Sequence, residues 1–184
     1  MKRFDAISGI VDSISNEILV CNIGAPSREL FSIKDRDENF YMLGSMGLAS
    51  SIALGIAISK SKKKVWCIDG DGSILMNLGS LSTIANNQPS NLTLIVIDNG
   101  VYGSTGNQKT YTSNKTCLET IAKGAGFDSI TVISHKDDIM PTLKNLNKGC
   151  HFVKIMTLPG NAQVKNIPLK PEEIKDRFMK SIST

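Results

Sequence analysis

The sequence predicts an α/β protein: a doubly wound, mostly parallel six-stranded sheet with helices on both faces. Short apolar runs alternate with longer segments of helical periodicity, which is the pattern of repeated βαβ units. Residues 92–97 are apolar at nearly every position, as expected for a strand covered on both faces. Glycine-rich loops follow the first four predicted strands, whereas the opposite loops are lysine-rich or plain. No repeat or linker interrupts the pattern, so residues 1–184 are expected to form one domain.

The amino-terminal half begins with a helix, because apolar residues recur with the helical period from Phe4 to Ile14. Pro26 and Ser27 mark the entry into a second helix. The predicted elements are a helix at 4–14, a strand at 18–21, a helix entered through the loop NIGAPSREL, a strand at 40–43, a helix at 48–59, a strand at 65–68 and a helix at 74–85.

The carboxy-terminal half continues the alternation. The run at 92–97 is too short for a helix of such apolar character and suits a buried strand. The elements expected after it are a helix at 117–125, a strand at 129–133, a helix at 137–146, a strand at 152–156 and an amphipathic helix at 172–182.

The composition is that of an ordinary globular protein, with 41% hydrophobic residues and a net charge of +4. The lysine run at 60–64 precedes a strand, where a solvated loop is a better interpretation than a nucleic-acid patch. Aromatic residues make up only 5%, so base-stacking platforms are not expected. We find no signal peptide and no apolar stretch long enough for a bilayer, and therefore predict a soluble, cytoplasmic protein without membrane or nucleic-acid partners.

The cysteines and histidines do not form a metal-binding pattern. Cys21, Cys67, Cys117 and Cys150 have no short metal-type spacing, and three of them lie in or beside apolar strands as small hydrophobic residues. His135 precedes a predicted helix and His151 begins a predicted strand, so structural roles are favoured for both.

Four loops rich in glycine and small polar residues are expected at one edge of the sheet: NIGAPS, GSMG, GDGS and DNGVYGSTG. In open parallel sheets, ligands bind beyond the carboxyl ends of the strands, near the point where the strand order reverses. The dinucleotide-binding pattern G-x-G-x-x-G is not satisfied, because the next glycine after Gly70 and Gly72 is Gly79. The phosphate-binding pattern G-x-x-x-x-G-K-[ST] is absent from the sequence. The ligand is therefore held in another way.

Two side chains at this edge suggest a cation. Asp71 and Asn99 each follow a central strand, and neighbouring strands would bring their oxygen atoms together. Mg²⁺ prefers such oxygen ligands and shares its shell with substrate phosphates, while amides at Gly72 and Ser73 open a helix, where phosphates bind. Taken alone, residues 98–100 also fit a simple turn, and residues 44–47 fit a strand-to-helix turn with a core methionine. Taken together, the loops favour a binding site.

The segment from Gly70 to Gly72, followed by Asn99, resembles the G-D-G…N-N motif that binds thiamine diphosphate, with Asp98 in the first position of the asparagine pair. The stretches FYMLGSMGLASSIALGIA, GDGSILMNLGSLSTIA and IDNGVYGSTGNQ are similar to the cofactor-pyrophosphate domain of thiamine-dependent 2-oxoacid decarboxylases. With NIGAPSREL they are most similar to the sulfopyruvate and phosphonopyruvate decarboxylases, and NGVYGSTGNQ to the sulfopyruvate decarboxylase beta subunits. The resemblance extends over essentially the whole chain.

The resemblance implies thiamine diphosphate and Mg²⁺ as cofactors, with a defined set of contacts. The metal ligands would be Asp71, Asn99 and the carbonyl of Val101. The diphosphate would be held by amides of Gly72, Ser73, Tyr102 and Gly103, with Gly24 and Ala25 closing from the first loop. In the segment Gly44, Ser45 and Met46, the Gly44 carbonyl and the Met46 amide would contact the pyrimidine, and the Met46 side chain would lie under the bent cofactor.

The resemblance also implies a missing half. Family members activate the cofactor with a glutamate on a separate pyrimidine-binding domain, and no catalytic residue is assigned to this chain. Its own glutamates lie in helix or surface contexts: Glu17, Glu29, Glu38, Glu119, Glu172 and Glu173. We therefore expect a hetero-oligomer with a pyrimidine-domain (alpha) subunit that supplies the glutamate.

The activity implied is decarboxylation of 3-sulfopyruvate to sulfoacetaldehyde and CO2, as in coenzyme M biosynthesis. Arg28, beside the first loop, is the candidate for binding the second anionic group of the 2-oxoacid; a surface arginine paired with an acid is the alternative. Other functions remain open: a phosphonopyruvate decarboxylase, another 2-oxoacid decarboxylase or oxidoreductase subunit, or a non-catalytic thiamine diphosphate-binding regulator. The cysteine spacing argues against iron–sulfur clusters.

Overall fold

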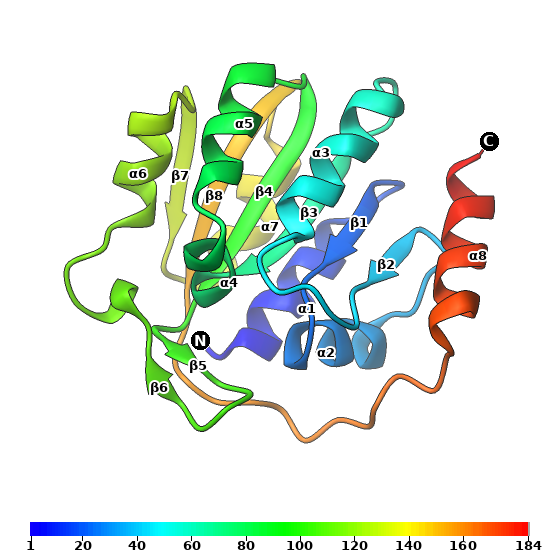
Figure 1. The fold of residues 1–184 in the computed structure, drawn as a ribbon, viewed down its shortest axis with the longest axis horizontal. Coiled ribbons are helices and arrows are strands. Elements are labelled where there is room, and N and C mark those ends of the chain that lie inside the picture. Colours follow the sequence, from blue (N-terminus) through cyan, green and yellow to red (C-terminus); the bar gives the residue numbers. More distant parts are fainter. Residues whose placement is uncertain (184) are drawn as a thin grey trace.

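The computed structural model describes residues 1–183 and is built on a parallel six-stranded sheet (Figure 1). The strand order is β2-β1-β3-β4-β8-β7, and every neighbouring pair runs parallel. The predicted fold class is therefore confirmed. The strands are β1 (Ile18–Cys21), β2 (Asn39–Tyr41), β3 (Val65–Gly70), β4 (Asn91–Asp98), β7 (Ser129–Ile133) and β8 (Gly149–Met156).

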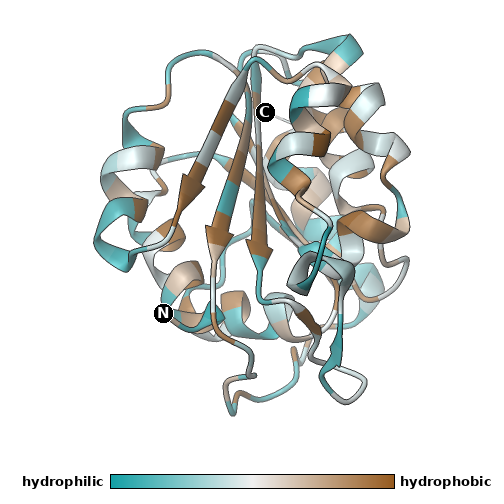
Figure 2. Cartoon of the chain, turned by 90° about the vertical axis from the view of Figure 1, so that its left-hand side faces the viewer, coloured by the Kyte–Doolittle hydropathy of each residue, from teal (hydrophilic) through white to brown (hydrophobic). Residues whose placement is uncertain are grey.

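Helices cover both faces of the sheet, as Figure 2 shows with helices on either side of brown, hydrophobic strands. One face packs against α3 (Ala49–Ser59), α5 (Gly79–Asn87) and α6 (Leu118–Ala125). The other packs against α1 (Arg3–Ser13), α2 (Ala25–Ile33) and α7 (Ile139–Lys144). Successive side chains of a central strand pack into opposite layers. In β3, Val65 and Cys67 belong to the hydrophobic core on the first face, and Trp66 and Ile68 belong to the core on the second.

The strand order reverses between β1 and β3, because the chain first adds β2 on one side of β1 and then returns to the other side. The loops after β1 and β3 therefore leave the sheet in a crevice at its carboxyl edge. Strands β3 and β4 are neighbours, with Gly70 opposite Ile97, which is the arrangement that would bring the side chains after the two strands together. This pairing brings the loop after β4 beside the same crevice.

The predicted helix at 74–85 is wrong in its extent. The chain forms a short α4 (Asp71–Met76), breaks at Asn77 and continues as α5. Asn77 leaves the helical conformation, and its side-chain Nδ2 donates to the Gly47 carbonyl at 3.0 Å. Asp71 is therefore the first residue of a helix rather than part of a loop.

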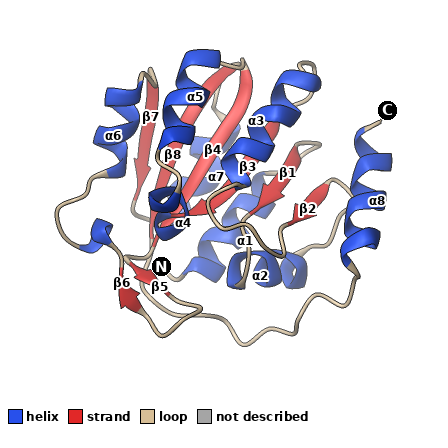
Figure 3. Cartoon of the chain, viewed as in Figure 1, coloured by secondary structure: helices blue, strands red, loops and turns tan. Residues whose placement is uncertain are grey.

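Other boundaries differ near the carboxyl edge. Strand β2 ends at Tyr41 instead of residue 43, because the chain turns away and leaves Leu43 more than half exposed. An antiparallel ribbon that we did not predict, β5 (Val101–Tyr102) with β6 (Gln108–Lys109), lies below the sheet in Figure 3. It is followed by the short 3-10 helix η1 (Tyr111–Ser113); a second, η2 (Lys136–Asp138), precedes α7.

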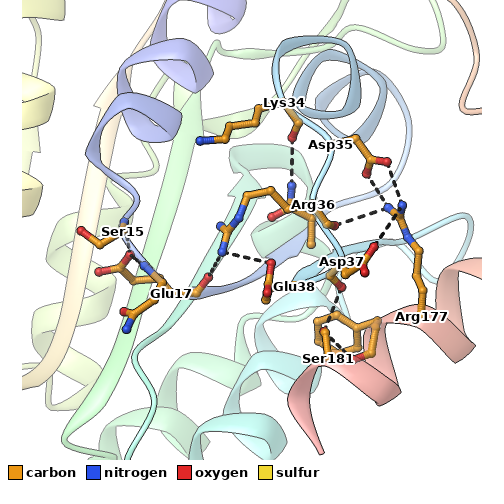
Figure 4. Close-up of polar contacts among 12 residues, drawn as sticks. Ser15, Glu17, Lys34, Asp35, Arg36, Asp37, Glu38, Arg177 and Ser181 are labelled. Atoms are coloured by element: carbon orange, nitrogen blue, oxygen red, sulfur yellow. Dashed lines mark hydrogen bonds and ion pairs between the residues drawn. The ribbon is translucent and has the colours of Figure 1, made fainter. Parts of the chain in front are cut away.

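The carboxy-terminal helix α8 (Pro171–Ile182) lies beside β2 at the edge of the sheet (Figure 1), and Figure 4 shows its Arg177 directed toward Asp35. Arg177 makes a two-pronged ion pair with Asp35, and its guanidinium lies 5.7 Å from the centre of the Tyr41 ring. Phe178 packs against Phe40 at 5.1 Å between ring centres. The helix is thus held by both charge and apolar contacts.

Three of the cysteine and histidine side chains assigned structural roles lie in strands of the sheet and are buried, namely Cys21, Cys67 and His151, whereas His135 is exposed at the start of η2. Cys21 and Cys67 are buried and free, and burial raises the pKa of the Cys21 thiol to about 12. His151 lies within β8, with Nδ1 2.7 Å from Ser129 Oγ and Nε2 2.8 Å from the Asn147 carbonyl. None of the helices formed by residues 1–183 combines the length and apolar character needed to cross a bilayer.

Candidate functional site

A cavity of about 220 Å³ lies at the carboxyl edge of the sheet, where the strand order reverses. It is surrounded by the loops that follow β1, β2, β3 and β4. The lining residues are Arg3, Asn22, Ile23, Gly24, Pro26, Met46, Asp69, Gly70, Asp71, Gly72, Ser73, Ile97, Asn99, Val101, Tyr102, Gly103, Ser104 and Thr105. Loops far apart in the sequence thus form one site.

The amino-terminal turn of α4 approaches the β5 ribbon without room for a side chain at Gly72. A Cβ atom there would lie 2.3 Å from Tyr102 Cε1, which is well inside van der Waals contact. The first turn of the helix therefore presents bare backbone amides beside Tyr102. Such amides, with the positive end of the helix dipole, are a suitable binding place for a phosphate.

Asp71 is held in a polar pocket although it is only 2% exposed. Its Oδ2 accepts hydrogen bonds from Thr110 Oγ1 at 2.5 Å and from Thr112 Oγ1 at 3.0 Å, and its Oδ1 accepts the Asn99 amide at 3.4 Å. Burial raises the pKa of Asp71; the Thr110 bond opposes this and the nearby Asp98 charge adds to it, with a net rise. A cation at this position would stabilise the ionised form.

The oxygen atoms around Asp71 fit a hard cation. Asn99 is buried, and among residues 1–183 its Oδ1 accepts a hydrogen bond only from the Val101 amide, at 3.1 Å, which leaves a second lone pair of that oxygen for a ligand. Carboxylate, amide and backbone carbonyl oxygens are the ligands that Mg²⁺ accepts. Within residues 1–183 there is no group of three or more His, Cys, Asp or Glu side chains that would hold a metal unaided. The donor set therefore suits Mg²⁺ that completes its shell with ligand phosphates.

Asp69 is a further carboxylate in the cavity wall. It is 1% exposed; its Oδ1 accepts the Gly70 amide at 2.9 Å, and its Oδ2 has no partner among the described residues. Burial raises the pKa of Asp69 to about 7, and the hydrogen bond from the Gly70 amide opposes this rise. A buried acceptor without a partner is an unsatisfied feature that a bound ligand could complete.

Ser73 connects the loop after β1 and the loop after β2 through its hydroxyl group. Its Oγ accepts the Gly47 amide at 3.0 Å and donates to Asn22 Oδ1 at 3.4 Å. Gly47 has φ +92°, in the left-handed region that glycine tolerates. Ser45 also has a positive φ, of 60°, which sets the turn that presents Met46 to the cavity.

The cavity brings together nine of the residues expected to bind the cofactor: Gly24, Met46, Asp71, Gly72, Ser73, Asn99, Val101, Tyr102 and Gly103. Three others are adjacent but do not line it. Ala25 is buried in the first turn of α2, and Gly44 and Ser45 are exposed at the rim.

Arg28 lies in a neighbouring hollow of about 210 Å³, which Gly24 also lines. Its Nη1 donates to Asn166 Oδ1 at 3.1 Å, and no ion pair forms between Arg28 and an acid within the described residues. The alternative interpretation of an acid-paired arginine therefore does not describe its contacts.

No glutamate of residues 1–183 lines the cavity. Glu29, however, does not have a surface position: it is fully buried and makes an ion pair with Arg3. Glu17 is also buried and accepts the amides of Ser15 and Asn16. The expectation of a helix or surface context holds for Glu29, which lies in α2, and is wrong for Glu17, which is buried and lies outside any helix.

Sequence reasoning missed Thr110, Thr112, Asp69 and Arg3. Asp69 carried a signal, since a charged residue at the end of an apolar strand and beside a glycine is unusual. The two threonines carried none, because their contact with Asp71 depends on how the β5–β6 ribbon folds back.

Two hollows of similar size lie at the opposite edge of the sheet. One of them, about 250 Å³ in volume and beside the start of β3, is lined by lysines 62–64 and by residues that begin strands, such as Asn91 and Gly149. The other is lined by Phe127, Gly149 and Cys150, among others. Both lie at the amino ends of the strands, where ligands of open α/β sheets do not usually bind.

Comparison with known proteins gives matches over the same loops. Residues 23–155 match the family described as thiamine pyrophosphate enzyme, C-terminal TPP binding domain. The chain is 53% identical over 183 residues to the sulfopyruvate decarboxylase subunit beta of Methanocaldococcus jannaschii, covering 98% of this chain and 97% of that protein. It is 41% identical to a sulfopyruvate decarboxylase of Methanosarcina acetivorans, covering 99% of this chain but only 47% of that protein.

Among solved structures, the chain is similar to a 2-oxoglutarate:ferredoxin oxidoreductase from Magnetococcus marinus, with a TM-score of 0.72. The match covers 95% of this chain and 66% of that one, at 18% sequence identity. At this level of identity the likeness supports the fold alone.

Proposed function

The chain belongs to the thiamine pyrophosphate enzyme family, and on that premise we propose that it is the subunit of a sulfopyruvate decarboxylase that binds the Mg²⁺-diphosphate half of the cofactor. The reaction is the conversion of 3-sulfopyruvate to sulfoacetaldehyde and CO2. The proposal rests on one structural observation. Asp71, Gly72 and Asn99 line the same cavity, which lies where the strand order reverses.

Bound thiamine diphosphate supplies the chemistry that breaks the carbon–carboxylate bond. The residues of this chain would bind the diphosphate half of the cofactor and orient it. Asp71 and Asn99, with the Val101 carbonyl, would hold Mg²⁺ against the diphosphate. The amides of Gly72 and Ser73, at the start of α4, would donate to phosphate oxygens.

The remaining contacts follow the cavity wall. Tyr102 and Gly103 would close over the diphosphate from the β5 ribbon, and Gly24, with Ala25 behind it, from the loop after β1. Met46, partly exposed in the wall, would support the two cofactor rings, with Gly44 and Ser45 at the rim. In this assignment residues 1–184 form a single diphosphate-binding domain.

The proposal includes a partner subunit. Because no glutamate of the described residues lines the cavity, the group that activates the pyrimidine ring would come from a pyrimidine-domain chain. The M. acetivorans relative supports this division, since this chain matches 47% of its length and leaves the rest unmatched. The glycine-rich edge is the surface where the two chains would share the cofactor.

Reconstitution tests the proposal. The chain is purified alone and in complex with a pyrimidine-domain subunit, with Mg²⁺ and thiamine diphosphate, and CO2 release from sulfopyruvate, phosphonopyruvate and pyruvate is measured. We expect negligible turnover by the chain alone and turnover by the complex with preference for sulfopyruvate. Preference for phosphonopyruvate would select the alternative substrate, and cofactor binding without turnover in the complex would favour a non-catalytic role. Robust turnover by the chain alone would overturn the division of the site.

A further inference from the structure

Arg3 and Glu29 form a buried ion pair beside the cavity. Arg3 Nε and Nη2 donate to the two carboxylate oxygens of Glu29 at 2.8 and 2.9 Å. Arg3 is 6% exposed and Glu29 is fully buried. Both charges are removed from water, and separating them would leave each charge buried without a partner, which is energetically costly. The ion pair therefore holds the guanidinium in one position.

The ion pair is connected to the loop assigned to the diphosphate. Arg3 Nη2 also donates to Asn161 Oδ1 at 2.7 Å, and Asn161 Nδ2 donates to the Gly103 carbonyl at 2.8 Å. The Ala162 amide adds a hydrogen bond to Glu29 Oε1 at 2.9 Å. Figure 1 shows the segment after β8 running below the sheet edge, near the amino terminus and the β5 ribbon.

One nitrogen of Arg3 is left without a partner. Nε and Nη2 are used by Glu29 and Asn161, while Nη1 makes no hydrogen bond to any of residues 1–183. Arg3 lines the cavity and is the one cationic side chain among the described lining residues, where Asp69 and Asp71 are the acids. A fixed guanidinium with a free donor nitrogen is suited to a phosphate oxygen.

We propose that Arg3 is a ligand of the cofactor diphosphate, with Nη1 donating to the terminal phosphate and with Glu29 and Asn161 as positioning residues. This inference rests on the proposed function, because it assumes thiamine diphosphate in the cavity. The terminal phosphate is preferred because Arg3 is joined through Asn161 to Gly103, in the loop assigned to the diphosphate. If Arg3 only fastens residues 1–3 and 161–162 to the domain, its loss affects every ligand of the cavity alike.

The test compares two ligands that differ by the terminal phosphate. The complex with the pyrimidine-domain subunit is stripped of cofactor, and the affinities for thiamine diphosphate and thiamine monophosphate are measured with Mg²⁺ by calorimetry. The variant is the double substitution Arg3→Gln/Glu29→Gln, which leaves no unpaired buried carboxylate. Arg36→Gln, an arginine outside the cavity, is the matched control.

We expect the double variant to lose roughly 10- to 100-fold in affinity for thiamine diphosphate, the range for a hydrogen bond to a charged group. Its affinity for the monophosphate should change by less than about threefold, since that ligand lacks the phosphate concerned. Arg36→Gln should alter neither. Equal losses for both ligands, or no loss, would overturn the proposal. If the unaltered complex binds no thiamine diphosphate, the proposed function itself fails.

A second measurement does not depend on the variant folding. In a crystal structure of the unaltered complex with thiamine diphosphate and Mg²⁺, Arg3 Nη1 should lie within hydrogen-bond distance of a terminal phosphate oxygen. A separation beyond about 4 Å would overturn the assignment even if the variant data are inconclusive about folding.

Discussion

The Thr110 hydroxyl donates a hydrogen bond to the Asp71 carboxylate over 2.5 Å, although the two residues lie 39 positions apart in the sequence. Thr110 is 2% exposed and follows the β6 strand, so the ribbon that leaves the sheet after β4 folds back over the start of α4. The contact fixes the direction of the proposed principal metal ligand. Residues that orient a metal ligand contribute to affinity although they do not touch the metal.

Replacing Thr110 by valine should therefore weaken metal-dependent cofactor binding. The substitution keeps the shape but removes the donor, and loss of such a supporting bond typically costs about 10- to 100-fold in metal affinity. Titration of Mg²⁺ in the presence of thiamine diphosphate measures the effect. Thr131→Val, on edge strand β7, is the control. Equal Mg²⁺ affinity of the Thr110 variant and the parent would show that the contact has no orienting role.

Removing the Asp71 carboxylate should abolish Mg²⁺-dependent binding of thiamine diphosphate. The fold should survive, because Asp71 lies beside the acid Asp98 and its removal relieves a like-charge contact. Calorimetry on Asp71→Ala, with circular dichroism as the check on folding, measures both points. A folded Asp71→Ala protein with unchanged cofactor affinity would refute the metal assignment.

Two glycines at helix starts should respond in opposite ways to alanine. At Gly72 the new methyl group would collide with the Tyr102 ring at 2.3 Å, so we expect a loss of about 1–3 kcal/mol in unfolding free energy and weakened cofactor binding. At Gly79, the first residue of α5, no atom of the described residues would lie within 4 Å of an added Cβ, and alanine should raise the free energy of unfolding by up to about 1 kcal/mol. Urea unfolding measures both. Similar stability changes at the two sites would contradict the packing argument.

Arg28→Met tests the candidate for substrate recognition. If the hollow that Arg28 and Gly24 share receives the sulfonate, the variant should raise KM for sulfopyruvate by about tenfold or more and leave KM for pyruvate nearly unchanged. Steady-state kinetics of the complex give both constants. Equal effects on the KM values of the two substrates would indicate that Arg28 has a structural role, as the hydrogen-bond donor to Asn166.

The contact between α8 and the rest of the domain should weaken at acid pH. Burial pushes the pKa of Asp35 upward, but hydrogen bonds from Arg177 and Tyr41 outweigh it and hold the pKa below the usual carboxyl value. Since the folded pKa is lowered, the stabilisation is present above the unfolded pKa of about 4 and is lost as pH falls through the folded pKa.

The corresponding variant is Arg177→Met, with Lys175→Met as a control at a more exposed position of the same helix. At pH 7 the Arg177 variant should have a lower Tm, by a few degrees for a loss of about 1 kcal/mol. As pH falls through the lowered pKa of Asp35 the difference in Tm should shrink, because the protonated carboxyl group no longer forms the ion pair with Arg177. A difference in Tm that does not change with pH would show that the packing of Arg177 on Tyr41, not its charge, holds the helix.

The sequence by itself determined the fold class and most of the candidate site. Alternating apolar runs are a local property, so the strands of the sheet and their parallel arrangement could be predicted from periodicity. Loop composition marked Asp71, Gly72 and Asn99, since glycine and oxygen-bearing residues after buried strands have few other reasons to be there. That β3 and β4 are neighbours was left open by the sequence and is a finding of the structure.

The tertiary structure alone decided which distant residues support these side chains. Thr110 reaches Asp71 only because the β5–β6 ribbon turns back, and Arg3 meets Glu29 and Asn161 only because α1, α2 and the segment after β8 end at one corner. Helix α4 stops at Asn77 because its side chain bonds to Gly47, a contact between two loops. These contacts depend on packing between segments far apart in the chain, and periodicity and local propensity contain no information about them.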